Sequence, residues 1–158
     1  MRAGYLLAAA LLCASAAQAD ELRPFHRGSW HQVLQEHHGK PTIIHFWGLT
    51  CGPCLVELPA WGKLAREHPE LDLVVIAADP SPMPVDALSS TLDKAGLSRT
   101  ENWMFDSMSE RLRWEVDPNW QGELPMTILI GTDGSTQTTL GAADMGAVQT
   151  WLAGQARH

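Results

Sequence analysis

Two cysteines separated by two residues are the feature of this sequence best suited to chemistry. Cys51 and Cys54 enclose a Gly-Pro pair and follow directly after an apolar run that ends at Trp47. In the first turn of a helix this spacing brings both sulfurs within disulfide reach, and the free N–H groups of the helix N-terminus stabilise a thiolate on Cys51. Pro53 lacks an N–H and therefore fits this turn. We interpret Cys51 as an attacking thiolate and Cys54 as the resolving thiol one turn inward.

Other uses of the same two cysteines remain open. A purely structural disulfide across so short a loop removes little chain entropy, so it would stabilise the fold only slightly. A zinc site needs two further soft ligands, and no other cysteine follows residue 19. Copper(I) can be held by two thiolates alone. The spacing favours redox chemistry, with a copper(I)-binding chaperone as the alternative.

The first nineteen residues are typical of a secretory signal peptide. One arginine precedes an uncharged apolar run that extends from Leu6 to Ala17, and Ala17-Gln18-Ala19 fits the small-x-small cleavage rule. The alternative is a retained membrane anchor, for which the run is short. We predict cleavage after Ala19, which removes Cys13 and leaves Cys51 and Cys54. The mature chain is then expected in the periplasm or its equivalent.

Composition narrows the class of protein. The chain has 158 residues, 45% of them apolar, which is enough for one ordinary domain with a core. It carries 11 basic and 18 acidic residues, a formal charge of −7. This balance argues against binding to nucleic acid or to an anionic membrane, because both need a basic face. We expect no cofactor.

Apolar periodicity predicts the elements that position the dithiol. Residues 20–28 read as a loose lead-in. Strands are expected at 42–47, 71–78, 103–105, 125–130 and 135–140, and helices at 30–37, 53–67, 85–95, 107–114 and 143–153. This order describes a mixed α/β sheet with helices on both faces.

Two stretches resemble the TlpA/ResA-like thiol–disulfide oxidoreductases of the thioredoxin superfamily. The run from His45 to Pro59 (HFWGLTCGPCLVELP) is similar to the family string F-W-x-x-W-C-x-x-C-x-x-E-x-P, and GELPMT at 122–127 is similar to the segment that carries the family's cis-proline. The resemblance implies a thioredoxin-like fold, with a central mixed sheet, flanking helices and an insert at about 79–117. The expected organisation is a signal peptide at 1–19, a lead-in with a short helix at 20–38, and a thioredoxin-like domain at 39–158.

The resemblance also implies roles for individual residues around the dithiol. Pro125 matches the family's cis-proline, which exposes the backbone of the preceding residue, here Leu124, to a bound substrate strand. Glu57 matches a glutamate that the family places beside its active site, although by itself it reads as a solvated helix residue. Trp47 occupies a position that the family keeps aromatic.

Three departures from the family pattern affect these expectations. Thr50 stands where the family has a tryptophan just before the first cysteine, so the choice of partner is expected to differ. His45 lies where cytoplasmic thioredoxins keep a buried aspartate, and it is either a satisfied core histidine or a proton acceptor for Cys54. Residues 117–122 lack the glycine-rich string expected of a dedicated cytochrome c maturation protein.

The predicted function is thiol–disulfide exchange, in the direction of reduction. Reducing thioredoxins share the Gly-Pro dipeptide and have reduction potentials of about −270 mV, whereas strong periplasmic oxidants have reduction potentials of about −120 mV. The expected substrates are disulfide-containing secreted or membrane-anchored proteins. The resemblance implies a membrane thiol relay as electron donor. A reductase for cytochrome c maturation is a further alternative.

Overall fold

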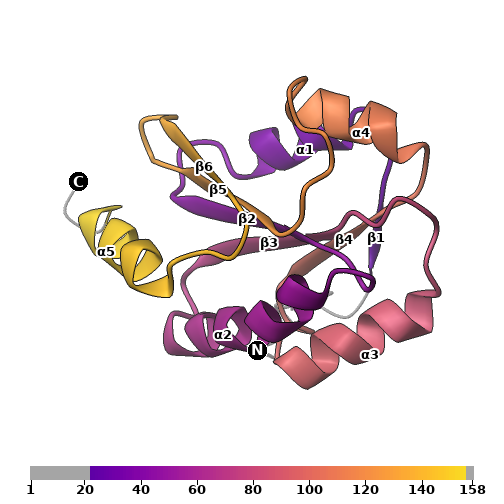
Figure 1. The fold of residues 1–158 in the computed structure, drawn as a ribbon. Helices are drawn as coiled ribbons and strands as arrows, with labels where there is room; N and C mark the ends of the chain where they lie inside the picture. Colours follow the sequence, from indigo (N-terminus) through magenta and orange to yellow (C-terminus); the bar gives the residue numbers. More distant parts are fainter. Residues whose placement is uncertain (1–21, 156–158) are drawn as a thin grey trace, which may run out of the picture.

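Six strands form one mixed sheet, in the spatial order β1 (Arg23–Phe25), β4 (Glu101–Phe105), β3 (Asp72–Ala77), β2 (Thr42–Trp47), β5 (Met126–Ile130) and β6 (Thr136–Leu140). The first four run parallel to one another, and β5 runs antiparallel both to β2 and to its hairpin partner β6 (Figure 1). The computed structural model describes residues 22–155. The expected signal peptide at 1–19 and its cleavage point lie outside these residues. Within them, no helix combines the length and the apolar character needed to cross a membrane.

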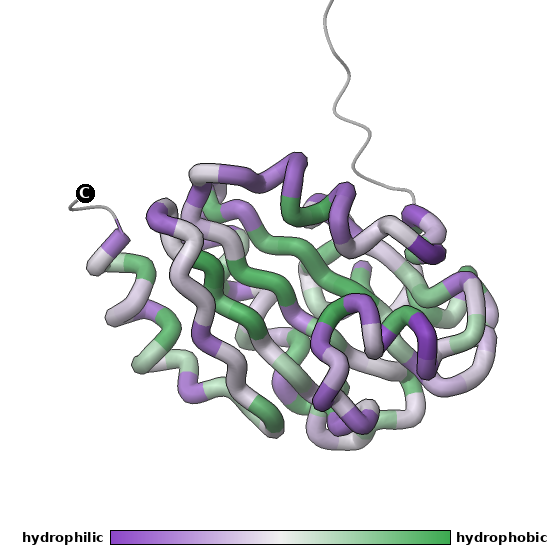
Figure 2. Tube along the Cα trace, turned by 90° about the horizontal axis from the view of Figure 1, so that it is seen from above, coloured by the Kyte–Doolittle hydropathy of each residue, from purple (hydrophilic) through white to green (hydrophobic). Residues whose placement is uncertain are grey.

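Helices cover both faces of the sheet, as the sequence predicts. One face carries α1 (Ser29–Glu36) and α4 (Ser109–Val116), and the other carries α2 (Gly52–Glu67), α3 (Val85–Ala95) and α5 (Met145–Gln155) (Figure 1). Side chains of β2 alternate between the two layers, because Ile43 and Trp47 join the cluster beneath α2 while Ile44 and Phe46 join the other. All of β2 is buried, and Figure 2 shows the central strands as a hydrophobic band.

The prediction of a loose lead-in is wrong for residues 23–25. These residues form β1, which pairs in parallel with β4 at the edge of the sheet. Phe25 is fully buried, with its ring centroid 5.8 Å from that of Trp103 and 5.2 Å from that of Phe105. Its partners lie some eighty residues further along the chain, so no local pattern reveals the strand.

The segment predicted as an insert, residues 79–117, contains α3, β4 and α4. Strand β4 lies between β1 and β3, so this segment supplies an internal strand of the main sheet. Helix α3 has the expected bounds and ends at Gly96, whose φ of 77° gives a left-handed C-cap.

Polar contacts at the amino ends of the parallel strands hold the first strand and helix against the sheet. Arg23 of β1 donates to Glu36 of α1 at 3.0 Å and to Glu101 of β4 at 2.8 Å. His37, just after α1, lies 3.1 Å from Glu101 and 3.3 Å from Asp72. The hydrogen bond to Glu101, with that to Asp72, raises the pKa of His37. This network lies at the end of the sheet opposite to the two cysteines.

The register of β2 and β5 positions the predicted cis-proline segment. Phe46 pairs with Met126 in the antiparallel ladder, so Pro125 lies across from the carboxyl end of β2, where the chain turns toward Cys51. The carboxyl ends of parallel strands gather loops at one edge of a sheet, which is where α/β proteins place their sites.

Candidate active site

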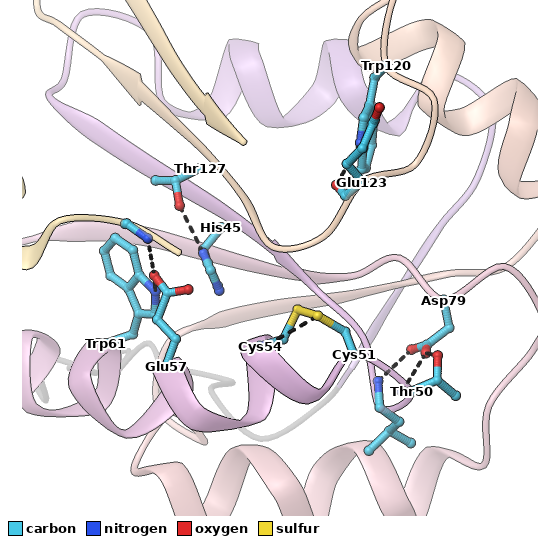
Figure 3. Close-up of a disulfide and its surroundings, with 12 residues drawn as sticks. His45, Thr50, Cys51, Cys54, Glu57, Trp61, Asp79, Trp120, Glu123 and Thr127 are labelled. Carbon is cyan, nitrogen blue, oxygen red and sulfur yellow. Dashed lines mark hydrogen bonds between the residues drawn. A yellow bond between two sulfur atoms is a disulfide. The ribbon is translucent and has the colours of Figure 1, made fainter. Parts of the chain in front are cut away.

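Cys51 and Cys54 form a disulfide at the N-terminus of α2 (Figure 3). Cys51 is the N-cap residue, and its Sγ accepts a hydrogen bond from the backbone N–H of Cys54 at 3.2 Å. The Cys54 side chain is fully buried, whereas Cys51 is partly exposed and Pro53 in the first turn is exposed. The outer sulfur is therefore the one that a partner protein can reach, and the inner sulfur is shielded.

Glu57 is a buried carboxyl, not a solvated helix residue. Its Oε1 accepts hydrogen bonds from the indole N–H of Trp61 at 3.0 Å and from the backbone N–H of Ala143 at 3.0 Å. Its Oε2 is buried and has no hydrogen-bond partner among residues 22–155. Burial raises the pKa of Glu57, and the two hydrogen bonds partly oppose that effect. Glu57 lies three residues after Cys54, so both project from the same side of α2.

His45 lies on β2, facing α2 from the sheet. Its Nδ1 is 3.1 Å from the hydroxyl of Thr127, and its ring centroid is 4.9 Å from that of Trp61. Burial lowers the pKa of His45 to about 3, so the imidazole is neutral near pH 7. Its Nε2 is buried and lacks a partner within the described chain. His45 and Glu57 thus each contact Trp61 and each keep one unsatisfied polar atom in the layer beneath the dithiol (Figure 3).

The Leu124–Pro125 peptide bond is cis. The side chain of Leu124 packs beside the loop that leads to Cys51, because a Cβ added to Gly48 would lie 3.2 Å from Leu124 Cδ1. Leu124 and Cys51 both pack at the margin of the apolar cluster that contains Trp47 and Cys54. Segments far apart in the sequence are therefore brought together around the disulfide.

Asp79 belongs to this site, and the sequence reasoning missed it. Asp79 is only 6% exposed, and its carboxylate accepts hydrogen bonds from the backbone N–H of Leu49 at 3.0 Å and of Thr50 at 3.2 Å. The Thr50 hydroxyl also donates to Asp79, at 3.2 Å. The one local signal was an acidic residue placed directly after a buried strand, ahead of a proline-rich loop.

Comparison with known sequences supports the resemblance. No protein-family model matches the chain. It is 32% identical over 101 residues to the thiol-disulfide oxidoreductase ResA of Halalkalibacterium halodurans, a match that covers 64% of this chain and 53% of that protein. It is 33% identical over 84 residues to the thioredoxin-like protein YneN of Bacillus subtilis, covering 45% and 49%. The chain spans about half the length of the curated relatives it matches.

Solved structures share the fold. A secreted disulfide oxidoreductase of Mycobacterium tuberculosis, described as homologous to E. coli DsbE, superposes with a TM-score of 0.60 at 23% identity, covering 76% of this chain and 85% of that one. StoA of Bacillus subtilis gives a TM-score of 0.55 at 23% identity, covering 73% and 84%. The fold is therefore thioredoxin-like, and it carries the dithiol at the start of α2. In sequence, the chain is similar to the thiol-disulfide oxidoreductase ResA and to the thioredoxin-like protein YneN.

Replacing Glu57 by glutamine is expected to lower the pH at which the Cys51 thiol ionises, by about half a unit to one unit. A buried carboxylate disfavours a second negative charge nearby, and glutamine keeps the acceptor for Trp61 and Ala143 while removing that charge. The measurement is the pH dependence of the alkylation rate of Cys51 in the reduced protein. Glu67→Gln, at the exposed end of the same helix, is the control. Equal profiles for wild type and Glu57→Gln would exclude Glu57 from the electrostatics of the dithiol.

Acid is expected to destabilise the wild-type protein through His45. The unfolded state binds a proton near pH 6.5, whereas the native pKa is about 3, so stability falls as pH decreases between these values. Between pH 7 and pH 4.5, His45→Phe should lose about 2 kcal/mol less unfolding free energy than the wild type. Urea unfolding at both pH values measures this difference, with the exposed His31→Phe as control. The same pH dependence in His45→Phe and wild type would contradict the burial of a neutral imidazole.

Proposed function

We propose that this chain is a periplasmic thiol–disulfide oxidoreductase that reduces disulfides in secreted or membrane-anchored proteins. The observation that carries this proposal is the pair of unequal sulfurs at the start of α2, with Cys51 partly exposed and Cys54 buried. The relatives named thiol-disulfide oxidoreductases support it.

The reaction needs two successive sulfur exchanges. In the reduced protein, the Cys51 thiolate attacks one sulfur of a substrate disulfide, which forms a mixed disulfide and releases one substrate thiolate. Cys54 then loses its proton and attacks Cys51 Sγ, which releases the second substrate thiolate and leaves the Cys51–Cys54 disulfide. Two electrons pass to the substrate. A membrane thiol relay must return two electrons to this disulfide before the next cycle.

The surrounding residues fit supporting roles in this reaction. The unsatisfied Nε2 of His45 is suited to receive the Cys54 proton, directly or through a water molecule, because a neutral imidazole has one acceptor nitrogen. Glu57 supplies a second buried group that can exchange a proton. The backbone of Leu124, before the cis Pro125, would align a substrate strand, and the packing of Leu124 beside the loop that leads to Cys51 supports this role.

The couple formed by Cys51 and Cys54 is expected to be reducing, below about −220 mV. The Gly-Pro dipeptide is shared with reducing thioredoxins, and their potentials differ from those of strong oxidants by about 150 mV, or about 7 kcal/mol for two electrons. Equilibration against a series of dithiothreitol or glutathione buffers, followed by thiol counting, measures the potential. A value near about −120 mV would reverse the proposed direction of electron flow.

Copper(I) binding is the alternative use of the same sulfurs, and a copper(I) titration of the reduced protein tests it. Among the described residues, the His/Cys/Asp/Glu group whose atoms are close enough to hold a metal is Glu36, His37 and Glu101. That group lies at the other end of the sheet and adds no ligand to the dithiol. The redox proposal is favoured instead by the unequal exposure of the two sulfurs, with Cys51 partly exposed and Cys54 buried.

A further inference from the structure

We propose that Asp79 is a positioning residue for Cys51. Its buried carboxylate clamps the turn between β2 and α2 and contacts Thr50, the residue that precedes the reactive cysteine. This inference rests on the proposed function, since it assigns a task to Asp79 in the chemistry of the dithiol. It concerns the turn in which this chain has Thr50 at the family's tryptophan position.

The turn is built from four residues. The backbone N–H of Cys51 donates to the carbonyl of Gly48 at 3.1 Å, which closes a turn with Leu49 and Thr50 at its centre. Both central N–H groups donate to the Asp79 carboxylate, one to each oxygen. A β-turn gives these two central N–H groups no acceptor in its own backbone. The Asp79 carboxylate therefore accepts from two N–H donors that the turn itself leaves without a partner.

The Thr50 side chain adds the third contact. Its hydroxyl donates to the same Asp79 oxygen that accepts from the Thr50 backbone. Thr50 itself is exposed, so this bond directs its hydroxyl inward from the surface around Cys51 (Figure 3). A tryptophan at this position has no hydroxyl to donate, and the pairing of Thr50 with Asp79 is therefore a feature of this chain's own residues.

The Asp79 carboxylate packs closely against the backbone of Gly48. A Cβ added to Gly48 would lie 2.8 Å from Asp79 Oδ1, so glycine allows the carboxylate to approach the turn. Asp79 follows β3, whose last residue pairs with Trp47 at the end of β2. Because β2 and β3 are adjacent and parallel, the turn after β2 and Asp79 after β3 lie at the same edge of the sheet.

The carboxylate also affects the charge balance at Cys51. The N-terminus of α2 favours a thiolate, whereas a negative charge nearby opposes it, so Asp79 is expected to keep the pKa of Cys51 higher than the helix alone would. The neighbouring elements carry other ionisable residues: His45 (β2), Glu57 (α2), Asp86 (α3), Asp106 (after β4), Arg113 (α4) and Glu123 (before β5). Of the acidic ones, Asp79 is the carboxylate that contacts the Cys51 turn directly.

The first test separates charge from structure. Asp79→Asn keeps the shape and one acceptor oxygen, and it should lower the midpoint of the Cys51 alkylation profile by about half a unit to one pH unit. The control is Asp106→Asn, which removes an exposed carboxylate at the same end of the sheet and should leave the midpoint unchanged. A folded Asp79→Asn protein with the wild-type midpoint would overturn the electrostatic part of the proposal.

The second test concerns the clamp itself. Asp79→Ala should increase the amide hydrogen exchange of Leu49 and Thr50 by about tenfold or more, while amides in β2 stay protected. Thr50→Val, which removes one donor and keeps the side-chain shape, should increase it less. Unchanged protection in both variants would overturn the clamp. Neither test needs a substrate, so the two tests of Asp79 are independent of the proposed function. A wild-type protein that reduces no disulfide would contradict the proposed function, and the results for the Asp79 and Thr50 variants would still decide whether Asp79 positions Cys51.

Discussion

A Cys54→Ser variant is expected to accumulate a mixed disulfide with its substrate protein, whereas a Cys51→Ser variant should form little or none. Exchange begins when the Cys51 thiolate attacks a substrate disulfide, and it ends when Cys54 displaces the substrate from Cys51. Serine at position 54 fills nearly the same volume but cannot attack sulfur, so the intermediate persists. Serine at position 51 leaves only the fully buried Cys54 sulfur, which a partner cannot reach.

Non-reducing electrophoresis of an extract of cells that produce each variant, followed by identification of the linked protein, measures this asymmetry. Turnover of a model disulfide should fall by at least about a hundredfold in each variant, so the contrast lies in trapping and not in activity. The double variant Cys51→Ser/Cys54→Ser is the control for adventitious linkage. Equal trapping by the two single variants would refute the assignment of nucleophile and resolving thiol.

The trapped protein also distinguishes between the proposed pathways. A partner with a copper site would point to the assembly of a copper enzyme. A partner with a haem-attachment motif would instead favour the role in cytochrome c maturation, which the missing glycine-rich string at 117–122 argues against.

Replacing Gly62 by alanine is expected to destabilise the fold by about 3 kcal/mol. Gly62 lies in the middle of α2, where an added Cβ would overlap the backbone carbonyl oxygen of Ala95 at the end of α3. A backbone atom cannot rotate away as a side chain can, so the two helices must separate. Because α2 carries Cys54 and Glu57, this separation should also disturb the buried layer beneath the dithiol.

Thermal and urea unfolding of the reduced and oxidised proteins measure this loss. The matched control is Gly154→Ala in α5, where a Cβ meets nothing within 4 Å. Alanine is the better helix former, so this variant should gain about 0.5 to 1 kcal/mol. A Gly62→Ala protein as stable as the wild type would mean that α2 and α3 are not packed as closely as described.

Local patterns predicted most of the elements in this fold. The β-branched run at 42–47 forms β2, and the helix expected at 85–95 forms α3 with the same bounds. The strands expected at 125–130 and 135–140 pair as the antiparallel hairpin of β5 and β6. In each case the residues that specify the element lie within the element or next to it. Strand β1 was missed for the opposite reason, since its three residues are defined by pairing with β4.

The candidate site also combines features that local sequence predicts with features that depend on distant residues. The spacing of Cys51 and Cys54 is a local property of a helix turn, so the sequence predicted the disulfide pair directly. The environment of Glu57 was not predictable from its helix, because its carboxyl accepts from Ala143, 86 residues away. The sequence did not predict a role for Asp79, because its hydrogen-bond donors, Leu49 and Thr50, lie about thirty residues earlier in the chain.

By itself, the sequence determined that this chain carries a reactive dithiol at a strand-to-helix junction, because two-residue spacing and a proline in the first turn act over a few ångströms of contiguous chain. The tertiary structure decided what surrounds that dithiol. Burial leaves His45 neutral and raises the pKa of Glu57, and the adjacent ends of β2 and β3 bring Asp79 to the turn before Cys51. Desolvation and contacts between distant strands depend on how the whole chain packs, and no short segment contains that information.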